Sequence, residues 1–161
     1  MLTFRRMTEE EFQIYLDKNI QGYAQTLIRG RDLDPETARK EAEDAFCGPF
    51  PDGLQTKDQF VMFIEDVRSG KTVGEIWYGY EVEDGVRQVY LSEFLIYEEE
   101  RRKGYASAAL EEMERRAKAD GCAVSALYVW DHNPAGCSLY RKCGYAAVSH
   151  GGGGSCMKKK L

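Results

Sequence analysis

The first third of the chain alternates between one short β-prone segment and two stretches of helical periodicity. Residues 2–7 are predicted to form a strand. Thr8 and Glu11 match the Thr-x-x-Glu capping box, and the apolar residues after them recur on one helical face. Asp34 and Pro35 then supply an N-cap and a first helical residue. The pattern predicts a strand followed by two helices.

The middle of the chain changes from helical spacing to β-type patterning. Residues 47–57 contain Gly and Pro at several positions and are expected to form a loop. Asp84 and Gly85 form a strong hairpin signal between two β-branched and aromatic segments. We therefore predict a three-strand meander over residues 59–67, 72–82 and 86–97.

A further helix is predicted after Gly104, where apolar residues recur on one helical face as far as about Asp120. Residues 123–130 then read as a strand, and Asn133 with Pro134 begins a short helix that runs to about residue 142. Opposite charges four residues apart predict ion pairs on the wet side of the longer helix: Glu111–Arg115, Glu112–Arg116 and Glu114–Lys118.

The last segment is expected to be a hairpin of residues 145–149 and 157–161 across the glycines Gly151 to Gly154. The Gly-Gly-Gly-Gly-Ser string resembles an engineered linker, but strand-like residues on both sides favour a native flexible hairpin loop. There is no internal repeat, and the 161 residues suit one domain over residues 1–161.

Composition narrows the class of protein. The chain is 43% hydrophobic and 30% charged, which is typical of a globular protein. It has no apolar run near the ~20 residues of a membrane helix and no signal-peptide pattern, so we expect a cytoplasmic protein without a membrane partner. Its net charge of −5 argues against nucleic acid as a partner. The five scattered cysteines indicate free thiols, and no metal site is expected.

The chemistry of the chain is concentrated where the third strand of the meander runs into a basic turn and then a helix. Three basic residues precede Gly104 and a helical stripe follows it. A turn of this kind directs backbone N–H groups and the positive end of a helix dipole at one point, which suits a phosphate or pyrophosphate. Gly104 lets the backbone approach an anion closely.

Two motifs carry a resemblance to a known family. Arg-x-x-Gly-x-Ala at residues 101–106 resembles the acetyl-CoA loop, Gln/Arg-x-x-Gly-x-Gly/Ala, of the GNAT superfamily of N-acetyltransferases. The segment from Asn133 to Tyr145 resembles that family's Asn-x-x-Ala-x-x-Leu-Tyr-x-x-x-Gly-Phe pattern, with Gly136 in place of the usual Ala and Tyr145 in place of Phe. The end of the chain also looks like the last strand of many small bacterial, single-domain members.

The resemblance implies the GNAT fold, an α/β (α+β) architecture with a mixed, mostly antiparallel twisted sheet of about seven strands and four helices. It implies acetyl-CoA as cosubstrate. Backbone at Phe94, Leu95 and Ile96 would pair with pantetheine and polarise the thioester carbonyl, and Asn133 would contact the pantetheine arm, serve as an N-cap, or do both. The remaining cofactor-binding residues would be Arg101, Arg102, Lys103, Gly104, Tyr105, Ala106 and Tyr140.

Two side chains are candidates for proton transfer. Glu93 lies on an apolar strand just before the proposed carbonyl site, so it would deprotonate the amine or else belong to a solvated strand face. Tyr140 would protonate the departing thiolate, or else pack in the core. The run Glu98 to Glu100 is expected to be solvated. Aromatic residues at Trp77, Tyr78 and Tyr80 are either an acceptor pocket or core.

The resemblance therefore implies an acetyl-CoA-dependent N-acetyltransferase that acts on a primary amine by direct attack in a ternary complex. A non-catalytic acyl-CoA-binding or regulatory domain, and an acyltransferase with another acyl-CoA, are the alternatives. The acceptor, a small-molecule or peptide amine, is not specified: a peptide N-terminus, lysine, polyamine, aminoglycoside and free amino acid all stay open. Relatives commonly form homodimers, which this sequence neither supports nor opposes.

Overall fold

The computed structural model describes residues 1–161 and divides them into two compact units. One unit comprises Met1–Arg6 with Phe60–Leu161, and the other comprises Met7–Gln59. We call them the sheet unit and the helical unit. The expectation of one domain over residues 1–161 stays a prediction.

The helical unit contains α1 (Glu9–Arg31), α2 (Pro35–Cys47) and a short 3₁₀ helix, η1 (Gly53–Gln55), within the expected loop. The predicted capping box is present, because the Glu11 N–H donates to the Thr8 hydroxyl at 3.2 Å and the Thr8 N–H donates to the Glu11 carboxylate at 2.8 Å. The two helices pack through a small apolar cluster of Ala24, Leu27, Ala38 and Ala42.

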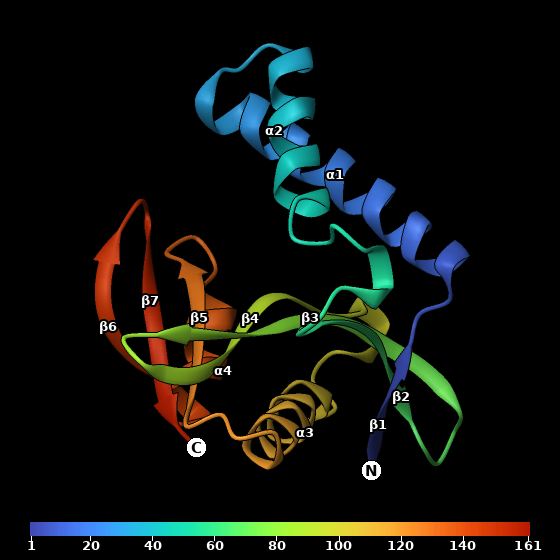
Figure 1. Cartoon of the computed structure of the whole chain (residues 1–161), viewed down its shortest axis with the longest axis vertical. Helices are drawn as coiled ribbons and strands as arrows, with labels where there is room; N and C mark the ends of the chain where they lie inside the picture. The colour runs from blue at the N-terminus through green and yellow to red at the C-terminus, as the bar shows by residue number, and fades with distance from the viewer. The chain divides into compact units, whose positions relative to one another are not determined.

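The sheet unit holds seven strands in the spatial order β1-β2-β3-β4-β5-β7-β6 (Figure 1). The pairs β1–β2, β3–β4, β5–β7 and β6–β7 are antiparallel, and β4–β5 is parallel. The predicted mixed, mostly antiparallel sheet and four α-helices are thus confirmed. The strands are β1 (Leu2–Arg6), β2 (Gln59–Asp66), β3 (Lys71–Glu83), β4 (Val86–Ile96), β5 (Val124–Trp130), β6 (Ala146–Gly151) and β7 (Gly154–Lys160).

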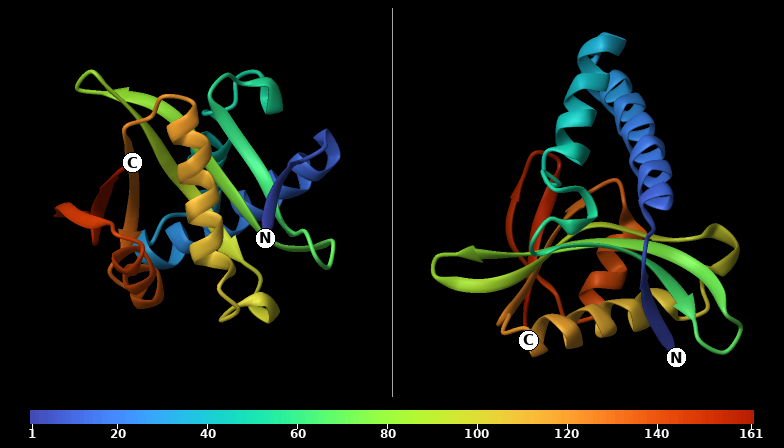
Figure 2. Two further views of the ribbon diagram at one scale, coloured as in Figure 1. Left: turned by 90° about the horizontal axis from the view of Figure 1, so that it is seen from below. Right: turned by 45° about the vertical axis from the view of Figure 1, so that its right-hand side comes forward.

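Helix α3 (Tyr105–Ala119) runs along one face of this sheet, as Figure 2 shows, and α4 (Pro134–Lys142) follows β5. The stripe predicted from the sequence places Leu110 and Met113 of α3 against the sheet, where neither is exposed to solvent. Tyr78 and Leu91 contribute to the same core from β3 and β4. We call this side of the sheet the α3 face.

Two of the three predicted ion pairs on α3 are wrong. Glu112 pairs with Arg116 as expected, but Arg115 also pairs with Glu112 rather than with Glu111. Glu114, however, is buried and accepts a hydrogen bond from Lys159 of β7 at 2.6 Å rather than pairing with Lys118. The spacing on the helix was correct, but a carboxylate that is turned toward the sheet takes the nearest cation there, which belongs to another element.

The C-terminal hairpin is tighter than expected. Its ladder continues to the pair Gly151–Gly154, so only Gly152 and Gly153 form the turn. Both turn residues have positive φ (65° and 86°), as a two-residue hairpin of this kind requires. Tyr145 precedes β6 and is buried in the core rather than lying in the strand.

No helix of this chain combines the length and the apolar character that crossing a membrane would need.

Candidate active site

Strands β4 and β5 separate part of the way along their length. They are paired in parallel from Gln88–Leu91 to Val124–Leu127, and the pairing ends there. Beyond that point Phe94–Ile96 of β4 pair only with β3. The edge of β4 beside these three residues is therefore open on the β5 side.

The open edge of β4 presents backbone groups. The Tyr97 N–H donates to the Val73 carbonyl of β3 at 3.0 Å. Since N–H groups alternate in direction along a strand, those of Phe94 and Ile96 point to the opposite edge, toward the opening. The Ile96 carbonyl accepts a hydrogen bond from the Arg101 Nε at 3.1 Å. The Ile96 N–H points to the same edge, where β5 no longer pairs with β4.

A β-bulge decides which way Glu93 points. Trp77 of β3 is opposite Glu93, whereas Tyr78 is opposite Leu91, so Ser92 is an extra residue in β4. Leu91 packs in the core on the α3 face. Strict alternation would direct Glu93 to the same core, but the extra residue turns its carboxylate to the other face of the sheet. The bulge is the feature that sequence patterning missed, because an apolar strand with one Glu gives no sign of it.

Glu93 lies close enough to Tyr140 for its charge to affect the ionisation of the phenol. The Glu93 side chain is open to solvent, yet it is surrounded closely enough by protein that desolvation raises its pKa to about 7. Burial, and then the charge of Glu93, raises the pKa of Tyr140 to about 12. The structure thus brings together the two side chains that the sequence singled out for proton transfer.

The Tyr140 ring is held by its neighbours. It packs edge-on against the Tyr145 ring with 5.9 Å between centroids, and the Tyr145 N–H donates to the Tyr140 carbonyl at 3.0 Å. The Tyr145 hydroxyl shares a hydrogen bond of 2.7 Å with Ser125 in the core. Two further groups near Tyr140 are the thiols of Cys137 and Cys143, each of which also raises its pKa. Their spacing of three residues on either side of Tyr140 is a helical signal that could have revealed them.

The basic turn has the backbone of an anion site. Arg102 and Gly104 both have positive φ, 64° and 86°. Gly104 is the N-cap of α3 and contributes no side chain, and the first bond of the helix is donated by the Ala108 N–H to the Gly104 carbonyl at 3.2 Å. The N–H groups from Tyr105 to Ser107 are therefore free of intrahelical partners, at the positive end of the helix dipole.

The acidic end of this turn corrects one expectation. Glu100 is 3% exposed rather than solvated. It accepts hydrogen bonds from Lys103, at 2.9 Å, and from Lys71 of β3. Together with the Arg101–Ile96 bond, these contacts show that two of the three basic side chains of the turn hold its shape. Arg102 is exposed and donates no such bond.

Asn133 is the N-cap of α4, and its side-chain oxygen accepts a hydrogen bond from the Gly136 N–H at 2.9 Å. A Cβ at position 136 would lie 2.6 Å from the Asn133 amide nitrogen, so Gly136 permits this close cap. The capping interpretation of Asn133 is confirmed, and its contact with pantetheine stays a prediction.

Comparison with known proteins identifies the family. The family model "Acetyltransferase (GNAT) family" matches residues 31–145. This chain belongs to the GNAT acetyltransferase family. It is 29% identical over 147 residues to the uncharacterized N-acetyltransferase YdgE of Bacillus subtilis. The aligned region covers 91% of this chain and 93% of YdgE.

Solved GNAT structures agree with the fold. The crystal structure of YycN from Bacillus subtilis, described as an acetyltransferase, superposes with a TM-score of 0.82 at 26% identity and covers 94% of this chain and 96% of that one. The PaiA N-acetyltransferase of Thermoplasma acidophilum, solved in complex with coenzyme A, gives a TM-score of 0.70 at 17% identity and covers 100% of this chain and 99% of that one. The latter supports the GNAT fold alone.

Within this GNAT fold the aromatic residues of β3 fall into two groups. Tyr78 and Tyr80 belong to the core on the α3 face, where they contact Phe60. Trp77 is buried on the opposite face, beside Glu93 in the sheet register. The core interpretation is therefore confirmed for the two tyrosines.

Proposed function

We propose that this protein is an acetyl-CoA-dependent N-acetyltransferase that transfers the acetyl group to a primary amine by direct attack within a ternary complex. Family membership supports acetyl transfer. The observation that carries the finer proposal is the effect of the Glu93 charge on Tyr140, because Glu93 lies on β4 where its pairing with β5 has ended.

The cofactor would lie between the basic turn and the open strand edge. Its pyrophosphate would accept hydrogen bonds from the N–H groups of residues 102–107, where positive φ values and the helix N-terminus direct several donors outward. Its pantetheine arm would pair with Phe94 and Ile96 of β4. The Ile96 N–H would then polarise the thioester carbonyl. The structures of PaiA with coenzyme A, and of a spermidine N-acetyltransferase of Vibrio cholerae with CoA and spermine, provide related examples on this fold.

Glu93 would act as the general base. An alkyl ammonium group has a pKa near ~10.4 and must lose a proton before its nitrogen can attack. With a pKa of about 7, Glu93 is a stronger base than an ordinary carboxylate and still ionises near neutral pH. The proton would pass to Glu93 directly or through water.

Tyr140 would act as the general acid, and its acidity would depend on Glu93. A pKa of about 12 keeps the phenol protonated until the thiolate departs. Once Glu93 has accepted the amine proton it is neutral and no longer raises the pKa of Tyr140. The phenol therefore becomes more acidic at the stage when the C–S bond breaks and the sulfur needs a proton. The low-dielectric surroundings that raise the pKa of Tyr140 would raise that of the thiol as well, so the two groups stay comparable.

A steady-state assay of CoA release from acetyl-CoA across a panel of amines tests the proposal. We expect turnover with at least one primary amine and none with its N-methylated quaternary counterpart. Binding of acetyl-CoA without turnover on any amine would favour the regulatory alternative. Faster turnover with succinyl-CoA than with acetyl-CoA would favour another acyl donor.

A further inference from the structure

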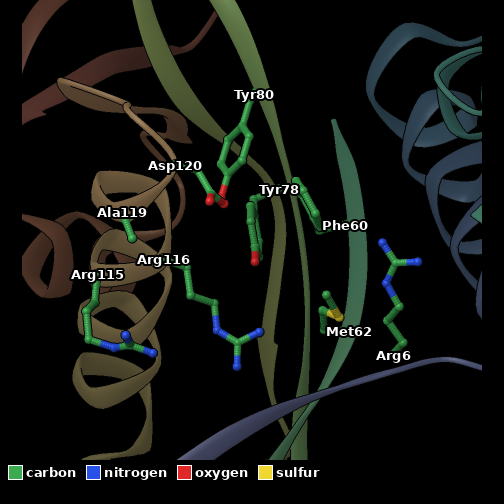
Figure 3. Close-up of a pocket in the computed structure, with 9 residues that line it drawn as sticks. All are labelled: Arg6, Phe60, Met62, Tyr78, Tyr80, Arg115, Arg116, Ala119 and Asp120. Carbon is green, nitrogen blue, oxygen red and sulfur yellow. The ribbon is translucent and has the colours of Figure 1, made fainter. Parts of the chain in front are cut away.

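The sheet unit contains a cavity on the α3 face that the proposed reaction does not use. It has a volume of about 230 Å³ and lies between the last turns of α3 and strands β1 to β3, as Figure 3 shows. The turn proposed for the cofactor lies at the other end of α3, before Tyr105. Glu93 points to the opposite face of the sheet. The cavity is thus separate from the candidate active site.

One wall of the cavity is aromatic. The Phe60 ring stacks on the Tyr78 ring, with centroids 5.0 Å apart and an interplanar angle of 21°. The Tyr80 ring lies 4.9 Å from Phe60, and its hydroxyl donates to Asp120 at 2.9 Å. Met62 completes this wall. An apolar or aromatic ring would find complementary surface here.

The rim of the cavity is cationic. Arg6, Arg115 and Arg116 line it, and Figure 3 shows the Arg116 guanidinium reaching toward the space beneath the Tyr78 hydroxyl. The Arg116 Nε donates to Glu112 at 2.7 Å, and its guanidinium carbon lies 4.8 Å from the centroid of the Phe4 ring. Both contacts fix the orientation of the group, and a further hydrogen-bonding contact with the Tyr78 hydroxyl places its terminal nitrogens at the cavity wall.

The positive charges around the cavity outnumber the negative charges by one. Arg115 and Arg116 share the single carboxylate of Glu112. Asp120 is bound to the Tyr80 hydroxyl, and Arg6 has no carboxylate partner among the ion pairs of the chain. Three guanidinium groups therefore face two carboxylates. This excess is local, because the whole chain carries a net charge of −5.

We propose that this cavity is a binding site for a small monocarboxylate with an apolar or single-ring body. The carboxylate would accept hydrogen bonds from Arg116, as guanidinium groups favour. The ring would pack against Phe60 and Tyr78. The volume lies below the roughly 300–1,000 Å³ of sites for drug-sized ligands, which limits the occupant to about one ring.

Benzoate is the probe, and its neutral isostere benzamide is the matched control ligand. Binding to the full chain is followed by calorimetry and by amide chemical shifts, with and without saturating CoA. We expect benzoate to bind saturably, benzamide to bind about tenfold more weakly because it lacks the charged acceptor, and CoA to leave both affinities unchanged. Shifts should centre on Tyr78, Tyr80 and the last turn of α3.

Two variants, with Ala123→Leu as a control, locate the site. Ala119 is exposed on α3 and lines the cavity, so Ala119→Leu should fill it and abolish benzoate binding, whereas Ala123→Leu, exposed but outside the cavity, should not. Arg6→Gln should weaken benzoate and leave benzamide unaffected. Any one of four results would overturn the proposal. The wild-type protein does not bind benzoate, or it binds benzoate and benzamide with equal affinity. Alternatively, Ala119→Leu binds benzoate as tightly as wild type, or CoA competes with benzoate.

Discussion

The Glu93 carboxylate on β4 and the Tyr140 phenol on α4 are electrostatically coupled, because the charge of the first raises the pKa of the second. Two local features bring about this coupling. The extra residue Ser92 turns Glu93 away from the core, and the edge-on contact with Tyr145 holds the Tyr140 ring. Each feature can be tested separately from the chemistry that it supports.

We expect Glu93→Gln to lower kcat/KM by about 10²- to 10⁴-fold, the usual contribution of a general base. In wild-type protein kcat/KM should fall below pH 7, as Glu93 takes up a proton with a pKa of about 7. This fall of kcat/KM below pH 7 should be absent from the pH profile of Glu93→Gln. Glu98→Gln, at an exposed position of the turn, is the control and should keep both the wild-type kcat/KM and its fall below pH 7.

The same variant should not be less stable above pH 7. The folded-state pKa of Glu93 is raised from 4.5 to about 7, so the folded protein binds this proton more tightly than the unfolded chain. Ionised Glu93 therefore weakens the fold above pH 7, and this penalty is lost as the pH falls. A melting temperature for Glu93→Gln at pH 8 that is well below wild type would assign the activity loss to damaged structure.

Tyr140→Phe should lower kcat strongly, by about 10²-fold or more, with little change in CoA affinity or melting temperature. The ring and its contact with Tyr145 remain, and only the proton is removed. Tyr145→Phe is the matched control. It should destabilise the fold by about 1–3 kcal/mol, because the buried Ser125 hydroxyl loses its partner, but it should leave kcat near normal. Full activity of Tyr140→Phe would leave Tyr140 as a packing residue.

Gly104→Val should weaken acetyl-CoA binding more than it weakens the fold. Nothing lies within 4 Å of a Cβ placed there, but φ of 86° is unfavourable for a β-branched residue, so the turn and its outward N–H groups must change. Gly85→Val carries the same kind of strain in the β3–β4 turn, with φ of 78° and equally open space. Calorimetry should show lost CoA affinity in the first variant alone. Equal acetyl-CoA affinities in the two folded variants would show that the turn does not bind the cofactor.

The sequence predicted most of the fold because its signals are local. The capping box at Thr8, the hairpin at Asp84 and the strand–turn–helix before Gly104 each need only neighbouring residues, and the structure contains all three. The candidate roles of Glu93, chosen as a carboxylate on an apolar strand, and of Tyr140, chosen from the family motif, stay predictions. The proximity of these two residues is a property of the folded chain.

The features that sequence patterning missed involve partners distant in the chain. Glu114 pairs with Lys159 rather than Lys118 because it faces the sheet, and Glu100 is buried because Lys71 of another strand reaches it. The Ser92 bulge is set by the register between β3 and β4. The cavity beside Arg116 forms only when α3 packs on the sheet. Periodicity along one segment contains no information about any of these.

Glu100→Gln should lower the melting temperature at pH 7, and the difference from wild type should narrow in acid. Lys103 and Lys71 lower the pKa of Glu100 below its ordinary value of 4.5. A carboxyl whose pKa is lowered on folding stabilises the fold above its unfolded pKa, and this contribution is lost as pH falls through the folded value. Glu99→Gln, at an exposed position, should show no such dependence when both are melted from pH 7 to pH 3. If the melting temperatures of Glu100→Gln and wild type differ by the same amount at every pH, the variant has lost packing rather than a charge interaction.

The glycines at the C-terminal hairpin allow a test of whether this segment is a defined turn or a flexible linker. The Tyr128 hydroxyl donates to the Gly151 carbonyl at 2.6 Å, so the glycine backbone lies against an aromatic side chain of β5. A Cβ at Gly154 would meet the Val129 carbonyl at 2.4 Å and the Tyr128 side chain at 2.8 Å. A Cβ at Gly151 would meet nothing within 4 Å.

Gly154→Ala should therefore destabilise the protein, because the clash involves the backbone of β5 and cannot be relieved by moving a flexible side chain. Gly151→Ala should be close to neutral, since its φ lies outside the left-handed region and its Cβ would lie in open space. The cost at Gly154 should be about 1–3 kcal/mol, which is typical of overpacking. Thermal and urea unfolding of both variants measure the difference. A flexible linker would tolerate both changes equally, so matching stabilities would show that the glycine string does not hold the close contact with Tyr128 and Val129.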